Sequence, residues 1–281
     1  MTRSPPYLLL TPVVLPPDAP VPMSDVLTQT QSLAARGFLA EQSLLRRHVV
    51  VYLSGAHAYG FPSPDSDLDL KCIHVAPTRE LVGMFPSEGG AESMVVRDGV
   101  EIDYGSNELG GVLRGVIKGN GNFLERILGE LVLDADYPRL AELRPLVKAS
   151  LSRRVQRHYA GFARSQLEAA EKSATAKRVL YVLRTALTGT HLLRTGELVT
   201  DLTELIDGHG LGEARELIAI KQRGEKTALA GDELARWRGE MDRVLAGLDA
   251  AAEGSRLPEE PPQRAVAALD GWLLEVRQAE W

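Results

Sequence analysis

The sequence predicts an α/β protein of the α+β type, in which a small mixed β-sheet domain is followed by an all-helical C-terminal domain. Two observations favour this fold. The first half alternates short β-rich runs, turn residues and helical stretches, whereas the second half is helical in pattern almost throughout. The length of 281 residues also exceeds one typical domain. We therefore expect a catalytic domain at residues 1–145, with a proline-rich arm at 1–23, and a helical domain at 146–281.

The first expected element is a helix. Ser24 is a candidate N-cap for a helical stretch that runs to about Arg47. The β-branched run Val49–Leu53 follows, and it is typical of a strand buried on both faces. Glycine and proline between residues 56 and 66 predict a short helical turn and a loop. The residues expected on the buried face of the helix are Leu27, Leu33, Ala34, Leu44 and Leu45.

A second strand and a β-hairpin are expected next. The strand is predicted at Asp67–Val75, and a helix at Thr78–Phe85 follows it. Asp98-Gly99 then separates two β-rich segments, Ser93–Arg97 and Val100–Tyr104, and this dipeptide favours the positive φ angles of a two-residue type I′ turn. The pattern is helical from Asn107 to Leu131, with a break at Gly119-Asn120-Gly121.

Six helical segments are predicted beyond Pro145, and no strand pattern interrupts them. Their expected ranges are Arg153–Glu171, Ala174–Thr195, Asp201–His209, Gly212–Arg223, Asp232–Ala252 and Pro262–Glu280.

Composition limits the classes of function. The formal net charge of −6 excludes a globally basic surface, so any nucleic-acid contact must use a local basic patch. The single cysteine, Cys72, excludes an intramolecular disulfide and fits a reducing compartment. No apolar run approaches the roughly 20 residues of a membrane span. We therefore expect a soluble, cytoplasmic protein without a membrane partner.

Acidic residues on two predicted strands form the strongest candidate site. Asp67 and Asp69 are two residues apart, so their carboxylates point to the same face of one strand. Two close carboxylates repel each other and are tolerated when a divalent cation lies between them. By the same parity, Glu101 or Asp103 on the hairpin completes a cluster of three. Three carboxylates that hold two Mg²⁺ or Mn²⁺ ions are the usual arrangement for in-line nucleotidyl transfer.

Other candidate residues lie on a turn and on two helices. Gly55 ends a buried strand, where backbone N–H groups can face a phosphate. Lys177, Tyr181 and Arg184 share one helical face, which either presents two cations to a triphosphate or is simply solvated. Four residues have either a role near the site or a purely structural role as turn residues and helix caps: His57, Tyr59, Lys118 and Asn120.

Three stretches of the sequence resemble a known family: GAHAYGFPSPDSDLDLK, VEIDYGSNELGGVLRGVIKGNGNFLERI and AKRVLYVLRTALTGTHLLRTGEL. They are similar to the polymerase-beta nucleotidyltransferase superfamily, and within it to a bacterial and phage subgroup linked to RNA repair. The resemblance implies that Asp67, Asp69 and Asp103 are catalytic metal ligands and that Gly55 belongs to the triphosphate loop. The serine that usually follows this glycine is Ala56 here. The phosphate contact is therefore expected from Ser54, Ser66, His57 or the backbone.

The expected reaction transfers a nucleoside monophosphate from an NTP, such as ATP, to an acceptor hydroxyl and releases pyrophosphate. The resemblance favours an RNA or tRNA end as the acceptor. The alternatives are transfer to a protein or a small molecule, and a nucleotide sensor without turnover. The expected nucleotide-binding residues are Ser54, Gly55, Ala56, His57, Ser66, Lys177 and Arg184. Base preference, the choice of metal and the oligomeric state stay open.

Overall fold

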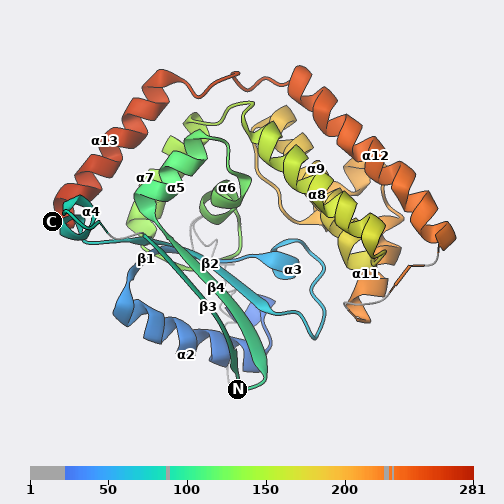
Figure 1. Cartoon of the computed structure of the whole chain (residues 1–281), viewed down its shortest axis with the longest axis horizontal. Coiled ribbons are helices and arrows are strands. Elements are labelled where there is room, and N and C mark those ends of the chain that lie inside the picture. The colour runs from blue at the N-terminus through green and yellow to red at the C-terminus, as the bar shows by residue number, and fades with distance from the viewer. Residues whose placement is uncertain (1–22, 87–88, 225–227, 230) are drawn as a thin grey trace, which may run out of the picture.

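The computed structural model describes residues 23–86, 89–224, 228–229 and 231–281 (Figure 1). The expected N-terminal arm therefore lies almost entirely outside the described residues. Within them, the chain forms a five-stranded mixed sheet in the order β3-β4-β2-β1-β5. The strands are β1 (Arg47–Leu53), β2 (Leu68–Val75), β3 (Gly90–Arg97), β4 (Val100–Glu108) and β5 (Val132–Ala135).

Strands β2 and β4 are parallel to each other, and all other neighbouring strands in the sheet are antiparallel. β2 pairs with β4 in a register that places Asp69 opposite Asp103. β1 lies on the other side of β2, antiparallel to it, and continues into the short helix α3 (Gly55–Ala58). The N-terminal halves of β2 and β4 therefore lie next to the turn that begins at the end of β1.

Helices cover both faces of the sheet (Figure 1). On one face, α2 (Gln29–Leu45) packs Phe38 edge-on against Tyr104, and both belong to one buried cluster with Leu68. On the other face, the buried residues Val50 and Ile73 belong to one apolar cluster with three helices. These helices are α5 (Leu109–Ile117), α6 (Gly121–Leu128) and α7 (Tyr137–Ala149).

The C-terminal half is helical, as predicted. The buried helix α9 (Ala176–Thr195) packs against α8 (Val155–Lys172), α11 (Ala214–Gln222) and α12 (Gly231–Glu253). Two short helices, α10 (Leu202–Leu205) and the 3-10 helix η1 (Asp207–His209), connect α9 to α11. The last helix, α13 (Gln263–Ala279), returns to pack on α7 and α5.

The two predicted domains share one apolar core. A single cluster of buried side chains extends from β1 to α13. The chain end also contacts the first half directly, because the backbone N–H of Thr78, in α4 (Thr78–Val82), donates to the carbonyl of Glu280 at 2.8 Å. The predicted domain boundary at residue 145 lies inside α7. The division of the chain into two domains stays a prediction.

The hairpin was predicted correctly. Asp98 and Gly99 have φ angles of 53° and 78°, as the two central positions of a type I′ turn require. Strand β5 was not expected, since its four residues are too few to show a pattern. In the described part of the chain, no helix has the length and hydrophobicity that a membrane crossing requires.

The prediction for the first helix was wrong in two respects. Thr28 and Gln31 form a capping box that starts α2, so the preceding residues form a separate short helix, α1 (Met23–Val26). The buried face consists of Ala34, Ala35, Phe38 and Leu39. Three leucines expected on this face are exposed instead, because Leu33 and Leu44 lie off the side of the helix that these four residues define, and Leu45 is its last residue.

Candidate active site

Two carboxylates lie side by side on the parallel strands. Asp69 on β2 is directly opposite Asp103 on β4, while the alternating residues Leu68 and Ile102 are buried on the other face. Glu101 is exposed and pairs with Val96 of the edge strand. The geometry therefore places Asp103, and not Glu101, next to Asp69.

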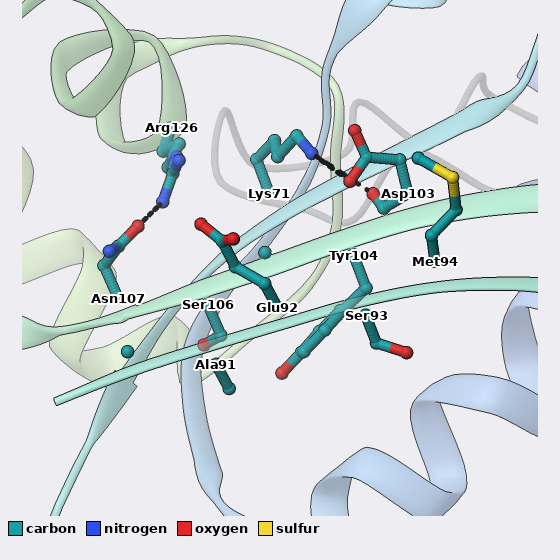
Figure 2. A pocket seen from close by; sticks show the side chains of 12 residues that line it. Lys71, Ala91, Glu92, Ser93, Met94, Asp103, Tyr104, Ser106, Asn107 and Arg126 are labelled. Atoms are coloured by element: carbon teal, nitrogen blue, oxygen red, sulfur yellow. Dashed lines mark hydrogen bonds and ion pairs between the residues drawn. The ribbon is translucent and has the colours of Figure 1, made fainter. Parts of the chain in front are cut away.

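Lys71 is a third charged group on this face, which the sequence reasoning missed. Its ammonium nitrogen lies 2.7 Å from Asp103 Oδ1 and 3.7 Å from Asp69 Oδ1 (Figure 2). The alternation that places Lys71 on the same face of β2 as Asp69 was the signal that would have found it. One protein cation thus lies between two of the three predicted ligands.

The environment of Asp69 disfavours the ionised form of its carboxylate. Burial, together with the nearby charges of Asp67 and Asp103, raises its pKa to about 7, although Lys71 acts in the opposite direction. A single ammonium group therefore does not offset the repulsion among these carboxylates.

The donor set fits a hard divalent cation. Carboxylate oxygens are the ligands that Mg²⁺ and Mn²⁺ prefer, and the raised pKa of Asp69 shows that the site favours additional positive charge. Among the described residues, however, no three His, Cys, Asp or Glu side chains form a ready metal-binding group. The predicted cluster is therefore not fully assembled in this arrangement.

The turn after β1 lies against Asp69. Gly55 has a φ of +66°, and a Cβ atom added there would lie 1.8 Å from Asp69 Oδ2. The preceding N–H of Ser54 donates to the backbone carbonyl of Asp69 at 2.8 Å. Only glycine permits this approach without displacement of the carboxylate. The half-buried Ser54 hydroxyl is 3.4 Å from the Tyr59 hydroxyl.

The next two residues of the turn point into the protein. Ala56 is buried in the apolar core. His57 is also buried, and burial together with the positive charge of Lys221 lowers its pKa. Its Nδ1 has no hydrogen-bond partner in the part of the chain that the structure describes. A contact between these residues and a nucleotide stays a prediction.

Ser66 takes part in a buried network that sequence reasoning also missed. Lys221 of α11 is fully buried, and its ammonium nitrogen is 2.7 Å from the hydroxyls of both Ser63 and Ser66. The two serine hydroxyls are 3.0 Å apart. This lysine thus fixes the loop that leads into Asp67 from the helical half of the chain.

The helical face of α9 is mostly interior. Tyr181 packs edge-on against Tyr59 and Phe61, at ring distances of 5.6 and 5.8 Å. Arg184 is buried, which excludes the alternative of a solvated basic position for this residue. Lys177 is half-buried, and its predicted contact with a triphosphate stays untested.

Arg184 forms a buried ion pair with Glu125 of α6. Its two terminal nitrogens lie 2.8 and 2.9 Å from the carboxylate oxygens, and the guanidinium stacks 3.4 Å from the centre of the Tyr59 ring. Burial alone would lower the pKa of Arg184, but the Glu125 carboxylate outweighs it, so the pKa is raised. The terminal nitrogens that were expected to contact a triphosphate are thus bonded to protein.

The break between α5 and α6 is a pair of helix caps. Lys118 is the C-cap of α5, and the Asn120 side chain accepts from the N–H of Asn122 at 3.0 Å as the N-cap of α6. Both residues therefore act as helix caps, as the structural alternative predicted, and a role near the site stays a prediction.

Comparison with known proteins identifies the family of this chain. A family model described as the RNA repair pathway DNA polymerase beta family, RlaP, matches residues 32–275. The chain therefore belongs to the class of polymerase-beta-type proteins. More narrowly, it belongs to the RNA repair pathway DNA polymerase beta family.

Similar individual proteins add little about function. An uncharacterized protein of Methanocaldococcus jannaschii, MJ0002, is 28% identical over 158 residues, which cover 55% of this chain and 64% of that protein. The uncharacterized protein YcgL of Bacillus subtilis is 28% identical over 198 residues, which cover 67% of this chain and 75% of that protein. A nucleotidyltransferase-like protein from Exiguobacterium sibiricum aligns at a TM-score of 0.33 with 9% identity, over 88% of this chain and 79% of its own.

We expect Gly55→Ala to disrupt the site as well as the turn. A methyl group there must displace the Asp69 carboxylate, and the positive φ adds about 1–2 kcal/mol of strain. Chemical denaturation and Mn²⁺ titration of the purified variant measure the two effects. Gly210→Ala is the matched control, since Gly210 has the same φ of +66° with nothing within 4 Å of the added Cβ. If both variants bind Mn²⁺ equally well, the contact with Asp69 is unimportant.

We expect Arg184→Met to lower the free energy of unfolding by about 3–5 kcal/mol, because it leaves the Glu125 carboxylate buried without its partner. The double variant Glu125→Gln/Arg184→Met should recover much of this loss, since no buried charge remains. Urea denaturation of the two variants tests this. Unchanged stability of the single variant with loss of NTP binding would instead identify Arg184 as a direct triphosphate ligand.

Proposed function

We propose that this protein transfers a nucleoside monophosphate from an NTP to an acceptor hydroxyl, with divalent ions held by Asp67, Asp69 and Asp103. The main support is the position of Asp69, which lies between Asp103 on the parallel strand and the glycine turn. Family membership supports nucleotidyl transfer as the type of reaction.

The residues have separate roles in this proposal. Divalent ions, when bound, supply positive charge that offsets the triphosphate and the carboxylates. Asp67 and Asp69 hold them, and Asp103 also accepts the proton of the acceptor hydroxyl. The acceptor oxygen bonds to the α-phosphorus as the bond to the β-phosphate oxygen breaks, and pyrophosphate leaves. Lys71 neutralises Asp103 until the substrates and ions are in place.

The triphosphate is proposed to lie along the glycine turn. Its contacts come from the Ser54 hydroxyl, from backbone groups between Gly55 and His57, and from Lys177. Arg184 acts indirectly, because it stacks on Tyr59, whose hydroxyl lies near that of Ser54. Ser66 likewise acts through the loop that Lys221 holds.

The acceptor is proposed to be an RNA or tRNA end. The description of the family as part of an RNA repair pathway supports this choice. The net charge of −6 requires the RNA contact to be local. Cytoplasmic location stays a prediction from the sequence.

The test is label transfer from each of the four α-labelled NTPs, with Mg²⁺ or Mn²⁺, to RNA, tRNA or a protein extract. Asp103→Asn should lower the rate by more than about 100-fold, since even residues that only support a metal ligand typically contribute 10–100-fold. Glu101→Gln is the matched control, because it removes a charge from the same strand at an exposed position.

Each result has a defined meaning. Label on RNA that disappears in Asp103→Asn supports the proposal, and label on protein names the alternative acceptor. NTP binding without transfer to any acceptor contradicts the proposed reaction and favours a sensor.

A further inference from the structure

A cavity of about 820 Å³ lies next to Asp103, over the outer strands of the sheet (Figure 2). Its walls come from β2, β4, the edge strand β3 and helix α6. In the strand order, the glycine turn approaches Asp69 from the side of β1, whereas this cavity extends from Asp103 toward β3. If the NTP lies along the glycine turn, the cavity is placed for the second substrate.

Arg126 is the principal cation at the inner end of this cavity. Its Nη1 donates to Asn107 Oδ1 at 2.6 Å and to the Cys72 carbonyl at 3.2 Å (Figure 2). Both acceptors are neutral, and among the described residues Arg126 has no ion pair with a carboxylate. Burial lowers the pKa of its guanidinium. A guanidinium that is held in place and partly desolvated favours an anionic ligand, above all a phosphate.

The other lining residues favour a nucleotide over a bare anion. Glu92 of β3 extends into the cavity between Lys71 and Arg126 (Figure 2). Its carboxylate repels a free anion but accepts hydrogen bonds from hydroxyl or amino groups. Met94 lies opposite Asp103 in the register and is 69% exposed, so it offers apolar surface to a base. The volume is within the range of about 300–1,000 Å³ typical of small-molecule sites.

We propose that this cavity binds the terminal nucleotide of the acceptor, with its phosphate at Arg126 and its attacking hydroxyl toward Asp103. This inference rests on the proposed function, which it deepens by naming the group that the acceptor must contain. A phosphodiester at an RNA 3′ end and the phosphate of a free mononucleotide share this chemistry.

The test is direct binding of an acceptor that does not react. A short oligoribonucleotide with a 3′-deoxy end, and separately AMP and UMP, are titrated into wild-type protein, Arg126→Met, Arg126→Lys and Arg157→Met. We expect Arg126→Met to weaken binding of the oligoribonucleotide by about ten- to a hundredfold, because a charge-assisted contact is lost. Arg126→Lys should retain part of the affinity. Arg157→Met, an exposed position on α8, should match wild type.

A second measurement keeps the test valid if Arg126→Met fails to fold. It uses an oligoribonucleotide in which one linkage is neutral. Replacement of the last phosphodiester by methylphosphonate should weaken binding to wild-type protein as much as the arginine substitution does, and the two changes should not add. Equal affinity of wild-type protein for both linkages overturns the inference. The comparison of oligoribonucleotide with AMP and UMP identifies which source of phosphate the cavity takes.

The outcomes separate this inference from the proposed function. Binding that depends on Arg126, in a protein without label transfer, supports the cavity assignment and contradicts the enzyme. Label transfer with an acceptor KM that is unchanged in Arg126→Lys supports the enzyme and contradicts the cavity assignment. If both hold, the acceptor KM rises in the Arg126 variants while the NTP KM does not.

Discussion

The repulsion among carboxylates on two parallel strands is the constraint on which the site depends. Asp69 lies opposite Asp103, with Asp67 nearby, and burial keeps water from screening their charges. Because burial and these neighbouring carboxylates raise the pKa of Asp69 to about 7, the arrangement costs folding free energy unless cations offset it. Lys71 supplies one positive charge from the protein. Under the proposed function, the electrostatic cost that Lys71 does not offset favours binding of divalent ions with an NTP.

Helices in the C-terminal half of the chain hold the turn and the loop that lie beside the carboxylates. Arg184 of α9 pairs with Glu125 and stacks on Tyr59, and Lys221 of α11 binds the two serines that precede Asp67. Each contact joins residues far apart in the sequence across a shared core. The turn and the loop on either side of the carboxylates are therefore set by helices that contribute no carboxylate themselves.

The periodicity of the sequence predicted those features that depend on a single strand or turn. The alternation along β2 and β4 predicted that Asp69 and Asp103 share one face, and the Asp98-Gly99 dipeptide predicted the turn between β3 and β4. The choice between Glu101 and Asp103 required the strand register, which the sequence does not encode locally.

Other features depend on tertiary contacts. Arg184 has the helical spacing of a surface cation, yet Glu125, 59 residues away, draws it into the interior. Leu44 and Leu45 continue an apolar pattern at the end of α2, but they are exposed in the part of the chain that the structure describes. Arg126 gave no signal in the sequence, because its position beside the cavity follows from how α6 packs on the sheet.

Under the proposed function, the positions of the charged residues account for how an acidic protein could bind a nucleic-acid end. Long-range attraction to RNA grows with the number of phosphates that a surface neutralises, and a chain with a net charge of −6 has little of it. Lys71 and Arg126 are instead placed beside acidic residues inside one cavity, so they contact few phosphates at once. We expect such an arrangement to bind internal stretches of RNA poorly. It fits the proposed ligand, a terminal nucleotide whose hydroxyl and phosphate would reach Asp103 and Arg126 together.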